Sequence, residues 1–395
     1  MTGPTLLSRR ALAAGLALPF LTRVAEAATP KDKKFVVIIC RGGMDGLSVV
    51  PPIGDPDYAG VRSALALGEG ALKLDGYFAL NPALTTVHAL ALAGQARIAP
   101  AVASPDRARS HFEAQDVLET GAADVYATTS GWLNRTVSAL SGTRKIDALS
   151  VGATAPLILR GPAPAASWSP GRGVDTTTRL PTLLQDLYRD DPLLGAALAR
   201  GLQTEDMART TGAASATGMM RPGGATQGRG IAREMGVALA GFLKAPDGPQ
   251  LAAVSVDGFD THANQTGVLA GRLGALDALI EGLHSGLGTV WANTVVLAVT
   301  EFGRTARANG TGGTDHGTAS TALLLGGALK PGGIIGDWPT LRQPALFENR
   351  DVAPTLDLRA LSKGLLAEHM GVDRRTLDTL IFPDSARIGT VTGLV

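Results

Sequence analysis

The sequence predicts an α/β fold in which a mostly parallel, doubly wound sheet has helices on both faces. Short, unbroken runs of Val, Ile, Leu and Ala are typical of parallel strands that are buried on both sides. Such runs occupy residues 35–40, 98–103, 148–152, 251–256, 294–300 and 321–325. Helical patterns lie between these runs, and strands that alternate with helices indicate a parallel sheet.

The segments between the apolar runs have helical periodicity and, in places, clear start signals. Ser110 and Glu113, for example, have the spacing of a capping box at the start of a helix. The expected helices cover residues 82–93, 110–120, 132–140, 180–200, 228–243, 263–287 and 351–370. One stretch rich in Gly, Ala and Thr interrupts the alternation, and we expect a mobile insertion around residues 205–230.

The first 27 residues have the features of a twin-arginine (Tat) signal peptide. Arg9 and Arg10 directly precede an Ala-rich apolar run at 11–21, and residues 25–27 (AEA) fit a small-x-small cleavage site. An ordinary secretory signal that carries two arginines is the alternative. The apolar run is too short for a membrane span. We therefore expect the Tat translocase to export the chain to the periplasm or beyond, with no stable membrane span in the mature protein.

The part of the chain that follows the signal, residues 28–395, is expected to form one large α/β domain. The whole chain has 36 basic and 35 acidic residues, a net charge of +1 that becomes about −1 once the signal is removed. Such a balance does not suggest a nucleic acid or an anionic membrane as partner. Cys40 is the only cysteine, so an intramolecular disulfide is impossible. Its place in an apolar run favours a buried residue over a metal ligand.

Polar clusters follow the expected strands or open the expected helices. They lie at residues 41–45, 109–111, 257–262, 300–305 and 313–317. Ligands of open α/β sheets bind outside the carboxyl ends of the strands, so these clusters indicate one shared site. Asp, Glu and His side chains suit a divalent metal, and Ser and Arg suit an oxyanion.

Six residues are candidate ligands of a divalent metal, which could be zinc, calcium, magnesium or manganese. They are Asp45, Asp260, His262, Glu301, Asp315 and His316. The last two, in a Gly-rich segment, form the most ligand-like pair of the chain. Structural alternatives exist: Asp45 could be a turn residue, Asp260 could cap the next helix, and Glu301 could form an ion pair with Arg304.

Four residues are candidates for catalysis: Ser110, His111, Arg109 and Arg304. A serine at a helix start lies among free backbone N–H groups, which suit an oxyanion, and a nearby metal could activate it as a nucleophile. A plain N-cap serine is the alternative. Arg109 and Arg304 could stabilise the negative charge that develops in the reaction. The remaining histidines lie inside expected helices and are expected to serve packing or the surface.

These segments resemble the domain-of-unknown-function family 1501. The matching motifs are RGGMDGL at 41–47, RSHFEAQ at 109–115, DGFDTH at 257–262, TEFGRT at 300–305 and GTDHG at 313–317. The resemblance extends over nearly the whole mature chain. Members of the family look like Tat-exported bacterial proteins, and the family is similar to the alkaline-phosphatase-like superfamily, which includes sulfatases and phosphate-transferring mutases.

The resemblance implies an alkaline-phosphatase-like fold and specific roles. Asp45 matches the first-strand metal ligand, and Ser110 matches the nucleophile at a helix start. Asp260 and His262 match the middle ligands, and Asp315-His316 looks like the late Asp-His pair. This pair normally follows its strand directly, whereas here Glu301 ends the strand. Either the loop carries the pair back, or Glu301 takes the Asp role with His316 as the last ligand, which would weaken a second metal position.

The combined expectation is an exported, metal-dependent hydrolase-like protein that acts on a small anionic phosphate or sulfate ester. The alternative is a non-catalytic periplasmic binding or assembly protein for an anionic sugar or cell-surface polymer, with a relic metal site. The two differ in metal content, because an intact ligand set should retain its metal through purification and a relic site should not.

Overall fold

The structure is a computed structural model that describes residues 33–140, 147–152, 154–170, 180–213 and 225–395. The expected signal peptide, residues 1–27, lies outside the described part of the chain, as do residues 214–224 of the expected insertion. No helix in the described ranges is long and apolar enough to cross a membrane.

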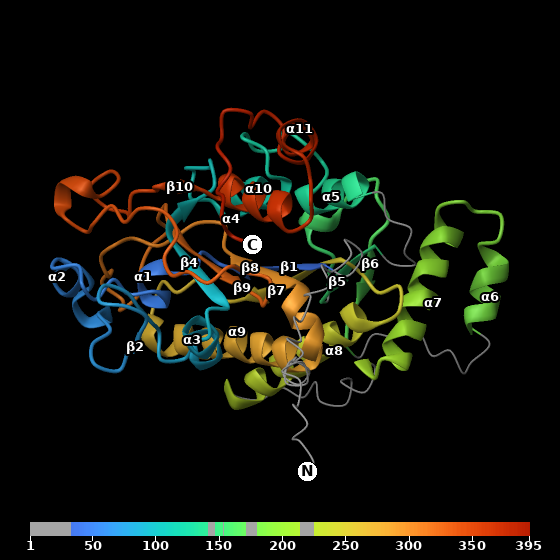
Figure 1. Ribbon diagram of the computed structural model, residues 1–395, viewed down its shortest axis with the longest axis horizontal. Coiled ribbons are helices and arrows are strands. Elements are labelled where there is room, and N and C mark those ends of the chain that lie inside the picture. The colour runs from blue at the N-terminus through green and yellow to red at the C-terminus, as the bar shows by residue number, and fades with distance from the viewer. Residues whose placement is uncertain (1–32, 141–146, 153, 171–179, 214–224) are drawn as a thin grey trace, which may run out of the picture.

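An eight-stranded sheet forms the centre of the molecule (Figure 1). Its strands are β1 (Lys34–Arg41), β4 (Ala96–Ala103), β5 (Ala148–Val151), β6 (Ala166–Trp168), β7 (Leu251–Asp257), β8 (Thr294–Val299), β9 (Ser320–Leu325) and β10 (Leu356–Asp357). They are arranged in the order β10-β4-β9-β8-β1-β7-β5-β6. A separate pair consists of β2 (Leu72–Lys73) and β3 (Ala79–Leu80).

The pairing of the strands confirms the predicted mostly parallel sheet. β1 lies in the middle and is parallel to both β7 and β8. β9 is antiparallel to its two neighbours, β4 and β8. A parallel return from β8 would need a crossover of a dozen or more residues, usually a helix. The connection at 300–319 instead contains turns and isolated bridges without a helix, and it carries two of the polar clusters.

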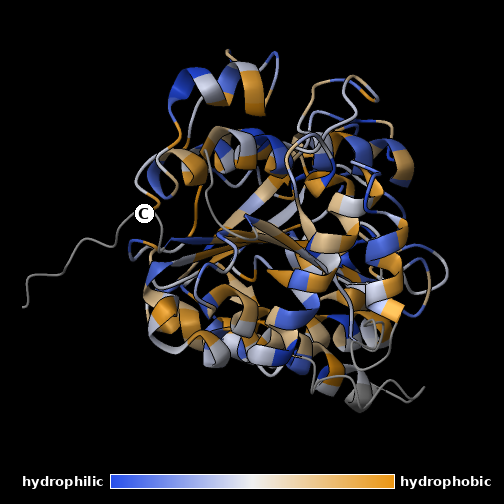
Figure 2. Cartoon of the chain, turned by 90° about the vertical axis from the view of Figure 1, so that its right-hand side faces the viewer, coloured by the Kyte–Doolittle hydropathy of each residue, from blue (hydrophilic) through white to orange (hydrophobic). Residues whose placement is uncertain are grey.

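Helices cover both faces of the sheet (Figure 1). One face packs on α3 (Thr85–Leu92), α8 (Ala225–Lys244) and α9 (Gln265–Leu287), and the other on α4 (His111–Thr120), α5 (Trp132–Leu140) and α10 (Leu358–Glu368). Side chains alternate along β1: Val36 and Ile38 belong to the first core, and Val37 and Ile39 to the second. The strands are accordingly mostly apolar, while the helices also carry many hydrophilic residues (Figure 2).

Some element boundaries differ from the prediction. The helix expected at 180–200 is two helices, α6 (Leu180–Leu187) and α7 (Leu194–Thr210). Pro192 cannot continue a helix, and the Asp191 carboxylate accepts hydrogen bonds from the N–H groups of Leu193 and Leu194 to start the next one. α7 and α8 also extend into both ends of the expected insertion.

Further differences occur near the C-terminus and at the sheet edges. The helix expected from residue 351 begins only at Leu358, where the side chain of Asp357 accepts a hydrogen bond from the Arg359 N–H. The strands β6 and β10 were missed because two or three residues are too few to show an apolar pattern. The short helices α1 (Gly46–Val49), α2 (Tyr58–Arg62) and α11 (Arg374–Thr376) were missed for the same reason.

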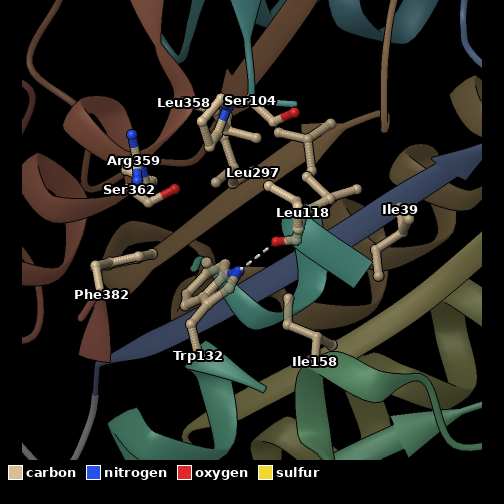
Figure 3. A pocket seen from close by; sticks show the side chains of 14 residues that line it. Ile39, Ser104, Leu118, Trp132, Ile158, Leu297, Leu358, Arg359, Ser362 and Phe382 are labelled. Carbon is tan, nitrogen blue, oxygen red and sulfur yellow. Dashed lines mark hydrogen bonds between the residues drawn. The ribbon is translucent and has the colours of Figure 1, made fainter. Parts of the chain in front are cut away.

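A small cavity lies in the core between β1 and the helices that cover it (Figure 3). Leu118, Trp132, Leu297 and Phe382 are among its lining residues, and the Trp132 indole N–H donates to the Leu118 carbonyl at 3.1 Å. Its volume is about 10 Å³, no more than one water molecule needs. This apolar cavity is a packing feature and not a ligand site.

Candidate metal centre

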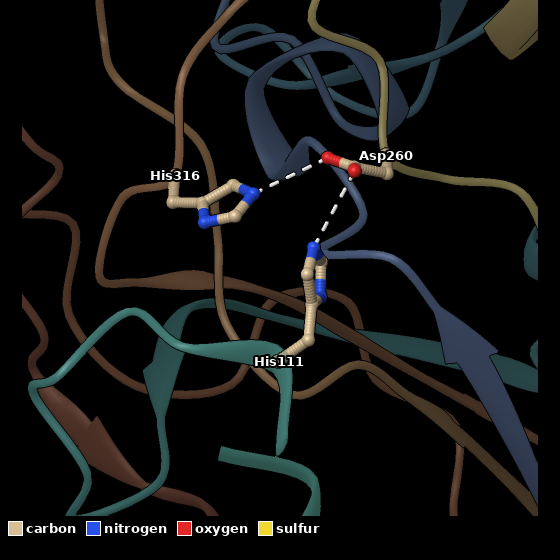
Figure 4. A group of neighbouring side chains, drawn as sticks. All are labelled: His111, Asp260 and His316. Atoms are coloured by element: carbon tan, nitrogen blue, oxygen red, sulfur yellow. Dashed lines mark hydrogen bonds and ion pairs between the residues drawn. The ribbon is translucent and has the colours of Figure 1, made fainter. Parts of the chain in front are cut away.

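Four side chains from three segments meet at the carboxyl edge of the sheet. Asp260 and His262 follow β7, His111 is the first residue of α4, and His316 lies in the connection between β8 and β9. Ligand atoms of His111, Asp260 and His316 all lie within 4.8 Å of one another (Figure 4). His262 adjoins them, with its Nε2 3.0 Å from Nε2 of His316 and 3.1 Å from Oδ1 of Asp260.

The local backbone brings these segments into contact. Gly42, directly after β1, has φ +116, and a Cβ atom there would lie 2.4 Å from the backbone nitrogen of Asp260. Gly313 is equally close to the other loop, because a Cβ would lie 2.3 Å from the His262 carbonyl carbon. The Gly-rich motifs therefore let three loops approach one another where a side chain would separate them.

Each of the three histidines has its Nδ1 bound to an oxygen acceptor. Nδ1 of His111 is 3.0 Å from Oε1 of Glu301, and Nδ1 of His262 is 3.2 Å from Oδ1 of Asp315. Nδ1 of His316 is 2.8 Å from the carbonyl oxygen of Arg109. Because these acceptors require an N–H donor, each neutral ring keeps a lone pair on Nε2. Histidines that bind metals are oriented in this way.

The Nε2 atoms face one another and the carboxylate of Asp260. Oδ1 of Asp260 and the Nε2 atoms of His262 and His316 are 3.0–3.3 Å apart in pairs. Ligands about 2.0–2.1 Å from a tetrahedral zinc ion are roughly 3.3 Å apart, so this triangle has the size of one face of such a site. Two nitrogen lone pairs that point at each other repel, and a cation between them would remove that repulsion.

His111 completes the group from the sheet side. Its Nε2 is buried, has no hydrogen-bond partner, and lies 3.5 Å from Oδ2 of Asp260. Buried polar atoms without a partner are rare in folded proteins, and a bound cation would satisfy this one. The residues present therefore fit a divalent metal. A set of three nitrogens and one carboxylate oxygen suits zinc better than calcium or magnesium, which prefer oxygen ligands.

The surrounding charges keep the carboxylates ionised. Burial of Asp260 disfavours its charged form, but the hydrogen bond and charge of Arg304 outweigh this effect and lower the pKa of the carboxyl. Burial of Glu301 acts in the same direction, and its hydrogen bonds with His111, Gln115 and backbone N–H groups together outweigh it and lower the Glu301 pKa. The hydrogen bond with Glu301 in turn raises the pKa of His111. Two anionic carboxylates thus adjoin the position where a cation would bind.

Comparison with known proteins places the chain in a family. The family described as "Protein of unknown function (DUF1501)" matches residues 86–381. The chain belongs to this family. The match includes four of the five motifs, and the RGGMDGL motif at 41–47 precedes it. No curated protein matches the chain by sequence.

Solved structures similar to this DUF1501 member include proteins of the alkaline phosphatase superfamily. The C-terminal periplasmic domain of EcEptC from Escherichia coli, in complex with Zn, shares 10% identity over 74% of this chain and 72% of that chain, with a TM-score of 0.35. A protein in the alkaline phosphatase superfamily from Vibrio parahaemolyticus shares 11% identity over 89% and 69%, with a TM-score of 0.40. The lipoteichoic acid synthase LtaP from Listeria monocytogenes shares 9% identity over 77% and 68%, with a TM-score of 0.37. Scores this low do not assign a reaction to this chain.

The structure places the six predicted ligands in three different environments. Asp260, His262 and His316 meet with His111, which the sequence had suggested as a catalytic residue. Glu301 and Asp315 instead hold the Nδ1 atoms of His111 and His262. In the structure the loop carries His316 to Asp260, while Glu301 and Asp315 lie behind His111 and His262.

Asp45 does not join the cluster, contrary to the expectation. Its carboxylate is buried and forms an ion pair with Arg62, and it also accepts hydrogen bonds from Ser48 and Gln265. The Arg62 side chain is fully buried and donates to the carbonyl oxygens of Thr305 and Ala306 as well. A carboxylate neutralised by a buried guanidinium needs no metal.

Neither predicted arginine is free to hold a substrate anion. The Arg304 side chain is 0% exposed and donates to Asp260 and to the carbonyl oxygens of Gly42, Gly43 and Thr314. It therefore joins the loops and positions Asp260. The guanidinium of Arg109 pairs with Glu348 and with buried Asp351. Its functional atom is the carbonyl oxygen, which a left-handed backbone (φ +57) directs to His316.

Ser110 occupies the N-cap position of α4, as the motif predicted, but its side chain makes no cap hydrogen bond. The hydroxyl is thus not committed to helix capping, and the residue adjoins His111 in the chain.

Sequence reasoning missed two supporting glutamines. Gln115 donates to Oε1 of Glu301 at 3.1 Å. Gln265 joins Asp45 to Thr261 and Thr314, the residues that precede His262 and Asp315. Gln115 could have been found, because it lies four residues after His111 and so on the same face of the helix. For Gln265 the sequence offered no signal.

Proposed function

We propose that this protein is an exported, metal-dependent hydrolase of phosphate or sulfate esters with one divalent cation, best zinc, at the centre built by His111, Asp260, His262 and His316. The observation that carries the proposal is the common orientation of the three imidazoles. Each Nδ1 is bound by an oxygen acceptor, and each Nε2 is directed to the carboxylate of Asp260.

The three histidines differ in burial. The side chains of His111 and His316 are 26% and 25% exposed, whereas His262 is 46% exposed and is held by Asp315, which is itself exposed. His111 and His316, with Asp260 held by the buried Arg304, would form the lasting ligand set. His262 would be the exchangeable ligand. Its free imidazole would accept the proton of the Ser110 hydroxyl and later donate it to the leaving group.

The bound cation would supply the positive charge that polarises the ester and lowers the pKa of a nearby hydroxyl or water. The chain supplies the remaining parts. Ser110, at the N-terminus of a ten-residue helix and without a capping bond, is the candidate nucleophile. The buried Arg304 pairs with Asp260 and positions it, but its guanidinium is not exposed to a substrate. Neither arginine is left for the transferred group, so the cation must carry most of the charge stabilisation.

A second candidate function, a metal-stabilised binding protein without turnover, is favoured by one observation. Four protein ligands would fill a tetrahedral site, and structural zinc sites are closed in this way. In that case His262 would stay bound, and removing it would lower metal affinity without affecting any reaction.

Metal analysis of wild-type protein matured through its own export route tests the proposal. We expect close to one zinc per chain and hydrolysis of p-nitrophenyl phosphate, bis(p-nitrophenyl) phosphate or p-nitrophenyl sulfate. His316→Ala should lose the metal and the activity, and His262→Ala should keep metal but lose turnover. His88→Ala is the control, because His88 lies on α3 and its ring hydrogen-bonds to the Lys73 carbonyl, outside the proposed centre. Metal without any turnover would favour the metal-stabilised binding protein. Absence of metal would refute both of these candidates and favour a binding protein with a relic site.

A further inference from the structure

A cleft of about 680 Å³ opens at the same carboxyl edge of the sheet as the metal centre. Its lining includes Arg41, Phe112, Gln115, Tyr126, Ser255 and Asp257. The volume is that of a site for a small organic ligand. None of the four metal-centre residues lines the cleft, so its function is a separate question.

The cleft is nevertheless connected to the metal centre. Gln115 lines it and donates to the same Glu301 oxygen that binds Nδ1 of His111. Arg41 lines it as well, and donates to Oε1 of Gln115 at 2.8 Å. Phe112, on its rim, directly follows His111 in the chain. A ligand in the cleft would therefore lie beside the residues that position the metal centre.

Two exposed aromatic rings border this cleft. Phe112 is 83% exposed and Tyr126 is 70% exposed, and no other aromatic residue of the described chain is among the large exposed hydrophobic residues. Aromatic rings in water lose the stabilisation that burial would provide. The two rings that the fold leaves in solvent thus lie at one cleft and not at scattered positions, which points to a ligand that covers them.

The backbone at Tyr126 supports the same conclusion. Its φ is +57, a left-handed conformation that is an outlier for a bulky side chain. The N–H of Tyr126 donates to the carboxylate of Asp116 at 2.7 Å, and Asp116 is buried. Strain of this kind persists only where the surroundings enforce it, and it gathers at ligand sites. Here it presents an aromatic ring to solvent at the cleft.

The polar lining has little net charge. Arg41 pairs with Glu119 at 2.7 Å, and the carboxylate of Asp116 is used by Tyr126. Arg160 and Asp257 remain as one cation and one anion. A strongly anionic ligand would need an excess of basic groups, which the lining lacks. Hydroxyl groups that both donate and accept would suit this mixture of guanidinium, amide, hydroxyl and carboxylate.

A sugar ring combines both required properties. Its C–H faces are apolar and stack on aromatic rings, and its hydroxyls hydrogen-bond to mixed donors and acceptors. We propose that this cleft binds a neutral pyranose of a saccharide, with Phe112 and Tyr126 as stacking platforms. Combined with the proposed function, on which this second step rests, the substrate would be a sugar ester whose phosphate or sulfate reaches the metal centre while the sugar occupies the cleft.

Binding of neutral oligosaccharides to the mature protein in EDTA tests the cleft without the metal. The probes are cellohexaose, maltohexaose, mannohexaose and N-acetylchitohexaose, measured by isothermal titration calorimetry. Wild type should bind at least one. Phe112→Ala and Tyr126→Ala should weaken binding about tenfold each, the effect of losing one aromatic stacking contact. Phe112→Trp and Tyr126→Phe keep a ring and should keep binding.

Leu92→Ala is the matched control, because Leu92 is 72% exposed on α3 and does not line the cleft. Its affinity should equal that of wild type. No binding of any probe by wild type would overturn the proposal, as would binding that neither alanine variant weakens. Failure of the two proposals can be distinguished. Ester hydrolysis without sugar binding would support the proposed function and refute the sugar site. Sugar binding without metal or hydrolysis would support the sugar site and refute the proposed function.

Discussion

Oε1 of Glu301, two residues past the end of β8, lies 3.0 Å from Nδ1 of His111, at the start of α4, and this contact turns the other ring nitrogen toward Asp260. The same oxygen accepts hydrogen bonds from the Gly42 N–H and from Gln115, and the Glu301 side chain is fully buried. Glu301 is therefore a positioning residue. In the proposed metal site it would set the tautomer and orientation of His111 without contacting the cation itself.

Replacing Glu301 by Gln should weaken metal binding by roughly 10–100-fold, the usual effect of removing a carboxylate behind a ligating histidine. Gln has the same size, so packing is kept while the charge on the His111 partner is lost. Competition with a chromogenic zinc chelator would measure the affinity. Glu281→Gln is the control, since Glu281 forms an exposed ion pair with Arg233 far from the centre. Equal affinities of the two variants would contradict the assigned role.

Asp45→Asn should destabilise the protein and leave its metal content unchanged. The change removes the charge that neutralises buried Arg62, and an uncompensated buried charge costs about 3–5 kcal/mol. Urea unfolding of the metal-free protein measures this loss of unfolding free energy, and metal analysis of the folded variant measures content. The contrary result is a variant that loses its metal while the metal-free protein unfolds at the same urea concentration as wild type. That result would make Asp45 a ligand, as the family resemblance implied.

Ser110→Ala should abolish turnover, retain the metal and change stability by less than about 0.5 kcal/mol. The small effect follows because the Ser110 side chain makes no cap hydrogen bond, whereas loss of a real cap costs about 1 kcal/mol. Turnover of p-nitrophenyl esters, zinc content and urea midpoints would be compared with wild type. Activity that survives the substitution would assign the attack to a water molecule and not to the serine.

His369 should make stability depend on pH in a region remote from the metal centre. Burial lowers its pKa from 6.5 to about 4, and its Nε2 donates to the Lys34 carbonyl. Below pH 6.5 the unfolded chain gains a proton that the folded protein does not. The contribution is therefore complete above pH 6.5 and is lost as pH falls toward 4, by about 3 kcal/mol in total.

Urea unfolding of metal-free wild type and His369→Gln between pH 7 and 4 isolates this contribution. The free energy of unfolding of wild type should fall more steeply with decreasing pH than that of the variant, which has no titrating group at this position. Parallel curves would show that the ring is protonated in the folded state or has no depressed pKa.

The central strands could be predicted because they are buried on both faces and their apolar character shows in the composition. The runs at 35–40, 251–256 and 294–300 became β1, β7 and β8, which form the parallel centre of the sheet. β6 and β10 could not be predicted in this way. Two or three residues at a sheet edge are defined by their neighbours, β5 and β4, and not by a pattern of their own.

The clusters that build the candidate site were visible in the sequence, but the division of roles among their residues was not. The sequence by itself determined that Asp260, His262 and Glu301 reach the carboxyl edge of the sheet, because they follow their strands closely in the chain, whereas the course of the loop that carries His316 was left open. Only the tertiary structure decided that Asp45 pairs with Arg62 and that Glu301 lies behind His111. The physical reason is that a carboxylate's role depends on its nearest cation or N–H donor. Here those partners lie on other elements, and folding alone brings them within hydrogen-bond distance.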